Sequence, residues 1–138
     1  MLVKVPTKSS DFKVKMYNPD GSVFEKSGNG LRIFSKYLYD YDFTKNKSFT
    51  IETDGGIVES EIIKEYGNKA KLIKVDMGRA EFSSANIPIN FDKSECINEQ
   101  VQVGDKILVV NCVSMGNPHC VVFRNILDKE EILKYGTV

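Results

Sequence analysis

The sequence has few of the features that a membrane, secreted or nucleic-acid-binding protein needs. No apolar run approaches the roughly 20 residues of a membrane span, and residues 1–10 lack the apolar core of a signal peptide. The 19 basic residues balance the 19 acidic residues, so no net positive charge favours nucleic acid or an anionic membrane. These absences predict a cytoplasmic protein with no nucleic-acid or membrane partner.

Histidine and cysteine are also scarce. The single histidine is His119, and the three cysteines, Cys96, Cys112 and Cys120, form no C-x-x-C pair. An odd number of irregularly spaced cysteines is not a disulfide framework, and one histidine without such a pair is not a metal-binding pattern. We therefore expect no metal site, and we expect Cys112 and Cys120 to be buried, inert thiols in apolar strands.

What the sequence does contain is typical of a globular α+β protein. With 138 residues, of which 41% are hydrophobic, the chain has room for one ordinary domain or two small incomplete ones. Residues 27–40 have helical apolar spacing, which predicts a long helix buried on most sides, and Asp128 is expected to cap a short helix. Alternating or apolar runs separated by hairpin signals predict mostly antiparallel strands at 11–17, 48–53, 57–64, 71–77, 106–115 and 119–124.

One aperiodic segment, residues 78–92, interrupts this pattern and is the best candidate for a boundary between two parts of the chain. We place the first part at 1–78 and the second at 79–138.

Two glycine–asparagine loops are the strongest functional signals. Residues 27–32 (SGNGLR) open the long helix with Ser27 as the expected N-cap, and residues 114–119 (SMGNPH) turn between two strands. A helix start directs backbone N–H groups and partial positive charge toward whatever lies before it. Together the loops predict contacts to a small anionic ligand.

Three asparagines in or near these loops, Asn18, Asn29 and Asn117, can donate and accept hydrogen bonds close to the backbone, which suits a zwitterionic amino acid. Each is also explained as a simple turn residue, because Asn tolerates left-handed geometry. His119 either has a structural role, such as capping a loop, or orients a ligand.

The order of these motifs resembles the diaminopimelate epimerase family. The matching stretches, from about Asp11 to the end of the chain, are NPDGS at 18–22, SGNGLR at 27–32, IET at 51–53 with the following Gly-Gly, VDMG at 75–78 and SMGNPHCV at 114–121. The resemblance implies a diaminopimelate-epimerase-like α+β fold, with mixed, mostly antiparallel sheets around a central helix. It also implies that residues 1–78 belong to a first lobe and residues 79–138 begin a second.

The resemblance further implies an activity. These enzymes are cofactor-independent isomerases of lysine and cell-wall biosynthesis, and they interconvert LL- and meso-diaminopimelate by two-base proton transfer at the α-carbon. Carried over, Asn18, Gly28 and Asn29 would bind substrate from the first lobe. Asn117 would bind it from the second, with His119 close to the site.

Ser27 departs from the family, because it stands where the family has its first catalytic cysteine. A helix N-terminus can lower a thiol pKa enough to give a base near neutral pH, whereas a serine hydroxyl needs an adjacent base. Three explanations stay open: a natural variant that works with outside help, an engineered substitution, or a protein that binds without catalysing, in which Ser27 only caps the helix.

The resemblance also implies that the fold is incomplete at both ends. The family's N-terminal Gly-Asn-Asp-Phe loop should precede Asp11, and the segment with its second cysteine should follow Val138. Such a piece should be inactive alone, and its open sheet edges favour self-association, such as a homodimer. The alternatives are a non-catalytic amino-acid-binding module, a racemase of another amino acid, or a structural fragment without a site.

Overall fold

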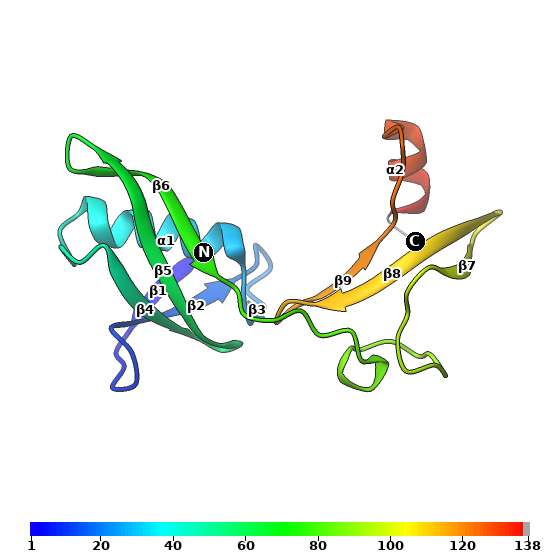
Figure 1. Ribbon diagram of the computed structural model, residues 1–138, viewed down its shortest axis with the longest axis horizontal. Helices are drawn as coiled ribbons and strands as arrows, with labels where there is room; N and C mark the ends of the chain where they lie inside the picture. The colour runs from blue at the N-terminus through cyan, green and yellow to red at the C-terminus, as the bar shows by residue number, and fades with distance from the viewer. Residues whose placement is uncertain (137–138) are drawn as a thin grey trace. The chain divides into compact units, whose positions relative to one another are not determined.

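The protein forms two compact units in a computed structural model that describes residues 1–136 (Figure 1). The first unit comprises Met1–Arg79, and the second begins at Ala80. The junction between the two units lies between Arg79 and Ala80. Each unit has its own core and is described by itself.

The first unit is a mixed sheet with one helix. The strands of the sheet run in the order β1-β2-β4-β5-β6, and β3 pairs with β2. All pairs are antiparallel except β2 with β4. The bounds are β1 (Leu2–Val5), β2 (Phe12–Tyr17), β3 (Val23–Phe24), β4 (Ser48–Thr53), β5 (Gly56–Tyr66), β6 (Lys69–Asp76) and α1 (Gly28–Asp40).

The helix of this unit packs along one face only. Figure 1 shows α1 beside β5 and β6, and Leu31, Phe34 and Leu38 are its buried apolar residues. The expectation that it is buried on most sides is wrong: Ile33 is 63% exposed and Tyr37 is 43% exposed. A single sheet covers the helix from one side, so residues pointing away from the sheet stay in solvent.

The hairpins of the first unit follow the glycine signals. Gly56, after the β4 strand, has a φ of 104°, and Gly67 and Asn68 between β5 and β6 both have a φ of 57°. Two consecutive left-handed residues are what a tight two-residue hairpin needs, and Gly and Asn adopt that geometry most easily.

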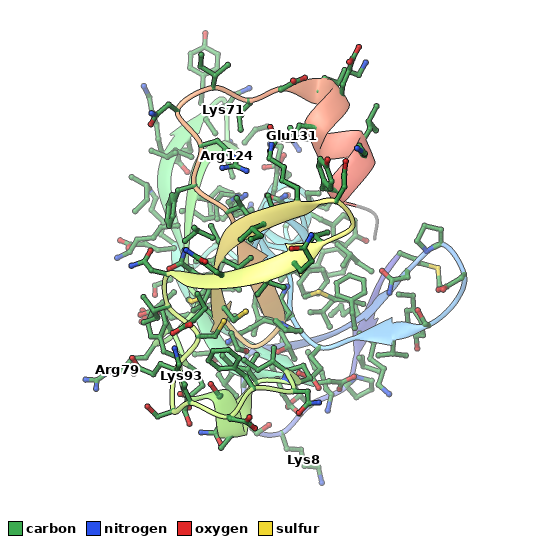
Figure 2. The ribbon with its side chains drawn as sticks, turned by 90° about the vertical axis from the view of Figure 1, so that its right-hand side faces the viewer. Lys8, Lys71, Arg79, Lys93, Arg124 and Glu131 are labelled. Atoms are coloured by element: carbon green, nitrogen blue, oxygen red, sulfur yellow. The ribbon has the colours of Figure 1, made fainter. Side chains whose placement is uncertain are left out.

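The second unit is a three-stranded antiparallel sheet followed by a short helix. Its core consists of Cys96, Leu108, Val110 and Cys112. Figure 2 shows Arg124 and Glu131 pointing toward one another, and their ion pair of 2.8 Å ties the chain after the sheet to the helix. The elements are η1 (Ser84–Asn86), β7 (Glu99–Val103), β8 (Lys106–Ser114), β9 (Pro118–Val121) and α2 (Lys129–Tyr135), in the strand order β7-β8-β9.

Two expectations for this unit are wrong. The last strand ends at Val121 and does not reach Arg124, because the chain leaves the sheet toward α2. Cys120 is exposed, although Cys112 is buried as expected. It lies in β9, an edge strand of the sheet, where nothing in the described chain covers its side chain.

The α+β class and the mostly antiparallel sheets are confirmed. The structure adds three strands that the sequence pattern did not reveal, β1, β3 and β7.

Candidate functional site

The start of α1 leaves two neighbouring backbone donors open. The Gly30 N–H donates to Ser27 Oγ at 3.1 Å, and the Leu31 N–H donates to the Ser27 carbonyl at 2.8 Å. In the described chain, the N–H groups of Gly28 and Asn29 have no such acceptor. Helix-start donors of this kind attract anions, because they carry partial positive charge.

The helix start is also free of negative charge and close to a guanidinium. The first turn of α1 holds no acidic residue. Arg32 Nη2 donates to the side-chain oxygen of Asn29, and Arg32 Nη1 would lie 3.5 Å from a Cβ atom placed on Gly28. The guanidinium therefore orients the Asn29 amide and adds positive charge beside the open N–H of Gly28.

A buried lysine, which sequence reasoning missed, precedes the cap. Lys26 is only 7% exposed, and its Nζ donates to the Met77 carbonyl at 3.0 Å. In the described chain no carboxylate pairs with it. The Met77 sulfur would lie 3.7 Å from a Cβ on Gly28, so the same residue contacts both the lysine ammonium and the helix start.

A buried ammonium without a carboxylate is unfavourable unless an anion compensates for it. Lys26 therefore adds positive charge to the first unit that no carboxylate of the described chain neutralises. No sequence signal marks it, because its burial depends on the tertiary packing of its side chain against Gly55 and Met77.

Ser27 serves as a cap and has no base beside it. Its φ of −148° and ψ of 119° are the extended geometry of an N-cap, as the sequence predicts. In the described chain, the hydroxyl oxygen of Ser27 has one hydrogen-bond partner, the Gly30 N–H. A serine activated for proton abstraction would need an adjacent base within hydrogen-bond reach.

Asn18 lies in an exposed turn whose hydrogen bonds are mostly internal. Its N–H donates to the Ser22 carbonyl at 2.8 Å, and its Nδ2 donates to Ser22 Oγ at 3.0 Å. Gly21, with a φ of 85°, closes the turn by donating to the Asn18 carbonyl at 3.0 Å. The structure thus explains Asn18 as a turn residue. In the described chain no donor hydrogen-bonds to its side-chain oxygen.

Asn117 and His119 come together in the second unit. The turn between β8 and β9 has Gly116 at a φ of 89°, and the Met115 N–H donates to the Asn117 carbonyl at 3.1 Å. His119 Nε2 lies 3.2 Å from Asn117 Oδ1, so the imidazole holds the asparagine side chain in place. The structure therefore groups Ser27, Gly28 and Asn29 in one unit, and Asn117 with His119 in the other.

A separate cavity lies in the second unit. It has a volume of about 160 Å³ between β8 and α2, and its lining includes Leu108, Ile126, Leu127, Ile132 and Tyr135. None of the predicted site residues lines it, and its lining combines these apolar side chains with Arg124, Asp128 and Glu131.

Other site types find no support in residues 1–136. No group of three or more His, Cys, Asp or Glu side chains there is arranged to hold a metal ion. No helix within the same residues is long and apolar enough to cross a membrane.

Comparisons with known proteins show similarity to one family of isomerases. The family model for diaminopimelate epimerase matches residues 1–83. Diaminopimelate epimerase 2 of Nostoc sp. is 41% identical over 100% of this chain and 47% of its own length. The diaminopimelate epimerase of Acetivibrio thermocellus is 40% identical over 99% of this chain and 48% of its own length.

These matches correct the extent inferred from the motifs. They include the first ten residues, whereas the motifs suggested a match only from about Asp11. The chain spans about half the length of the curated relatives that it matches.

Solved structures agree on the fold. A probable proline racemase from Agrobacterium radiobacter superposes with a TM-score of 0.71 at 12% identity, covering 98% of this chain and 35% of that one. A hydroxyproline epimerase from Agrobacterium vitis superposes with a TM-score of 0.69 at 12% identity, covering 88% of this chain and 33% of that one.

Proposed function

The chain belongs to the diaminopimelate epimerase family, and we propose that it is a substrate-binding portion of an amino-acid isomerase of this kind. The proposed reaction is the cofactor-independent conversion of LL- to meso-diaminopimelate, in lysine and cell-wall biosynthesis in the cytoplasm. It proceeds by two-base proton transfer at the α-carbon. Because the chain spans about half the length of its relatives, the activity of the whole protein is part of the proposal.

One observation carries the proposal: the adjacent N–H groups of Gly28 and Asn29 are open at a helix start that has no acidic residue. Two neighbouring N–H donors match the two oxygens of a carboxylate. Arg32 adds positive charge beside Gly28, and the buried Lys26 adds positive charge at Met77 in the same unit. These features favour the α-carboxylate of an amino acid as the ligand group.

The second loop supports the same ligand class. The side chain of Asn117 is held by His119, and an oriented amide can both donate to a carboxylate and accept from an ammonium. We propose that Asn18 and Asn117 contribute further polar contacts to the amino acid, and that residues 1–78 and 79–138 belong to the two lobes of the family's fold.

The proton-transfer step requires two groups that exchange a proton with the α-carbon. Ser27 stands at the position of the first such group, and no base adjoins it in the described chain. The open N–H groups can still stabilise negative charge that develops on the carboxylate during proton removal. We therefore propose that this chain binds substrate but does not epimerise it alone.

A non-catalytic amino-acid-binding module is the second candidate, and the same observation at Ser27 favours it. The two candidates differ in what happens when a thiol is restored. In an epimerase-type site, Ser27→Cys supplies an acidic group at a helix start that lowers thiol pKa values.

Exchange in deuterated water tests the proposal. Wild-type chain and Ser27→Cys are incubated with LL-diaminopimelate, and deuterium at the α-carbon is followed by mass spectrometry alongside binding by calorimetry. We expect binding by both proteins, no exchange with wild type, and exchange above background with Ser27→Cys. Binding without exchange in either protein would favour the non-catalytic module, and absence of binding would contradict both candidates.

Self-association is part of the proposal as well. The strands β1 and β6 are the edges of the first sheet, and such edges can pair with a second copy. Sedimentation at several protein concentrations distinguishes a homodimer from a monomer.

A further inference from the structure

Two cysteines lie directly opposite each other in the second unit. Cys112 of β8 and Cys120 of β9 are register partners in an antiparallel pair, so their side chains leave the same face of the sheet. Neither belongs to the proposed ligand site. The pair lies three residues from Asn117 on the β9 side.

The hydrogen-bond pattern shows which type of pair they form. The Cys112 N–H donates away from β9, to the Cys96 carbonyl at 2.8 Å, and the Ser114 N–H likewise donates to the Glu81 carbonyl at 2.8 Å. The backbone N–H groups of Cys112 and Ser114 therefore point away from β9. Cys112 and Cys120 are thus a non-hydrogen-bonded pair of the two strands. Such pairs have Cα atoms about 4.5 Å apart, within the range that a disulfide spans.

The two thiols differ in access. Cys120 is exposed, whereas Cys112 is 7% exposed and packs in the second core. Cys96, which adjoins Cys112 through the backbone hydrogen bond, is 3% exposed. A reagent in solution can therefore reach Cys120 first.

We propose that Cys120 and Cys112 form a thiol–disulfide exchange site for a low-molecular-weight disulfide such as oxidised glutathione. Cys120 sulfur bonds to one sulfur of the reagent, whose S–S bond breaks, and one thiol leaves with the proton. Cys112 sulfur then bonds to Cys120 sulfur and displaces the second thiol, which takes the other proton. Two protein thiols are oxidised and one small disulfide is reduced to two thiols.

The buried partner makes the second step slow. Burial raises the pKa of the Cys112 thiol to about 12, and the neighbouring thiols of Cys96 and Cys120 add to the increase. Only the thiolate attacks a disulfide, so the mixed disulfide on Cys120 accumulates before the cross-strand bond forms. The finished bond would join β8 to β9 close to the turn that carries Asn117.

Mass spectrometry of the reduced chain treated with oxidised glutathione tests the inference. We expect one adduct, mapped to Cys120, followed by its loss and a Cys112–Cys120 disulfide. The second phase should accelerate about tenfold per pH unit between about pH 7 and about pH 9, because the Cys112 thiolate fraction rises by that factor.

Two variants and one control make the result decisive. In Cys112→Ala the adduct on Cys120 should persist, and in the surface variant Cys120→Ser no adduct should form at a comparable rate. Cys96→Ala should still give the Cys112–Cys120 bond. A first adduct on Cys96 or Cys112, a Cys96–Cys112 disulfide, or a wild-type adduct as persistent as that of Cys112→Ala would overturn the inference.

Discussion

Ser27 and Gly30 form the hydrogen bond that begins α1, with the Gly30 N–H donating to Ser27 Oγ at 3.1 Å. Because the serine oxygen serves this donor and the serine carbonyl serves Leu31, the N–H groups of Gly28 and Asn29 are the ones left open. The cap therefore determines which donors can meet a ligand. The same serine oxygen is a hydrogen-bond acceptor of the cap, and no base adjoins its hydroxyl group in the described chain.

Ser27→Ala removes the cap and should destabilise the first unit by about 1 kcal/mol, because the Gly30 N–H loses its acceptor. Urea denaturation followed through amide signals of first-unit residues measures this loss. Ser27→Asn is the matched control, since its side-chain oxygen can accept the same hydrogen bond and should restore most of the stability. Equal midpoints for Ser27→Ala and wild type would show that the cap contributes nothing.

Lys26→Met should separate binding from stability. Lys26 is buried and has no carboxylate partner in the described chain, so replacing it with an apolar side chain of similar length should leave stability unchanged or raise it. Affinity for diaminopimelate should fall about tenfold, as loss of one favourable charge interaction of about 1.4 kcal/mol predicts. Calorimetry of this variant is compared with Lys71→Met, which removes an exposed lysine of the same unit. Equal affinities of Lys26→Met and Lys71→Met for diaminopimelate would show that Lys26 does not contribute to binding.

Gly28→Ala should also weaken binding without harming the fold. A Cβ at this position meets Arg32 Nη1 at 3.5 Å and the Met77 sulfur at 3.7 Å, which are ordinary contacts, and alanine favours the helix. The added methyl group would stand beside the open N–H and hinder a carboxylate. We expect an unchanged or slightly higher unfolding midpoint and an affinity about tenfold lower. Undiminished affinity would mean that the ligand does not approach Gly28.

Glu52 should make the first unit sensitive to acid. Lys13, Ser9 and Thr7 all donate to its carboxylate and lower its pKa from the ordinary 4.5 to about 2. The folded state thus binds this proton less readily than the unfolded state does, so the stabilisation is complete above about pH 4.5 and disappears as the pH falls toward 2.

The measurement is the urea midpoint of wild type and Glu52→Gln across that pH range. The variant should be less stable near neutral pH and should lose less stability on acidification. Glu61→Gln is the control, because Glu61 pairs with Lys74 only at 3.8 Å in an exposed position. Parallel pH profiles for wild type and Glu52→Gln would contradict the linkage.

The sequence predicted elements whose pattern is local. The apolar spacing and the serine cap of α1, and the aspartate cap of α2, specify those helices without reference to the rest of the chain. The sequence marks the strand β7 only weakly, because Glu99–Val103 (EQVQV) has two apolar residues, Val101 and Val103, and buries none of its residues fully.

The site was predictable in part for the same reason. The motif at 27–30 specifies a capped helix start, and the structure has that start. Lys26 was not predictable, because a lysine is rarely buried and this one is enclosed by Gly55 and Met77, which lie far from it in the sequence. The exposure of Cys120 likewise depends on β9 being an edge strand, which sequence spacing does not reveal.

The most direct test of the account is a titration of isotope-labelled chain with LL-diaminopimelate, followed through the backbone amide signals of Gly28 and Asn29. We expect these two signals to shift together and saturably, and we expect smaller shifts in Lys26→Met. Gly28 and Asn29 signals that stay unmoved while signals of other residues shift would contradict ligand binding at this helix start. Absence of any shift at high ligand concentration would contradict it as well.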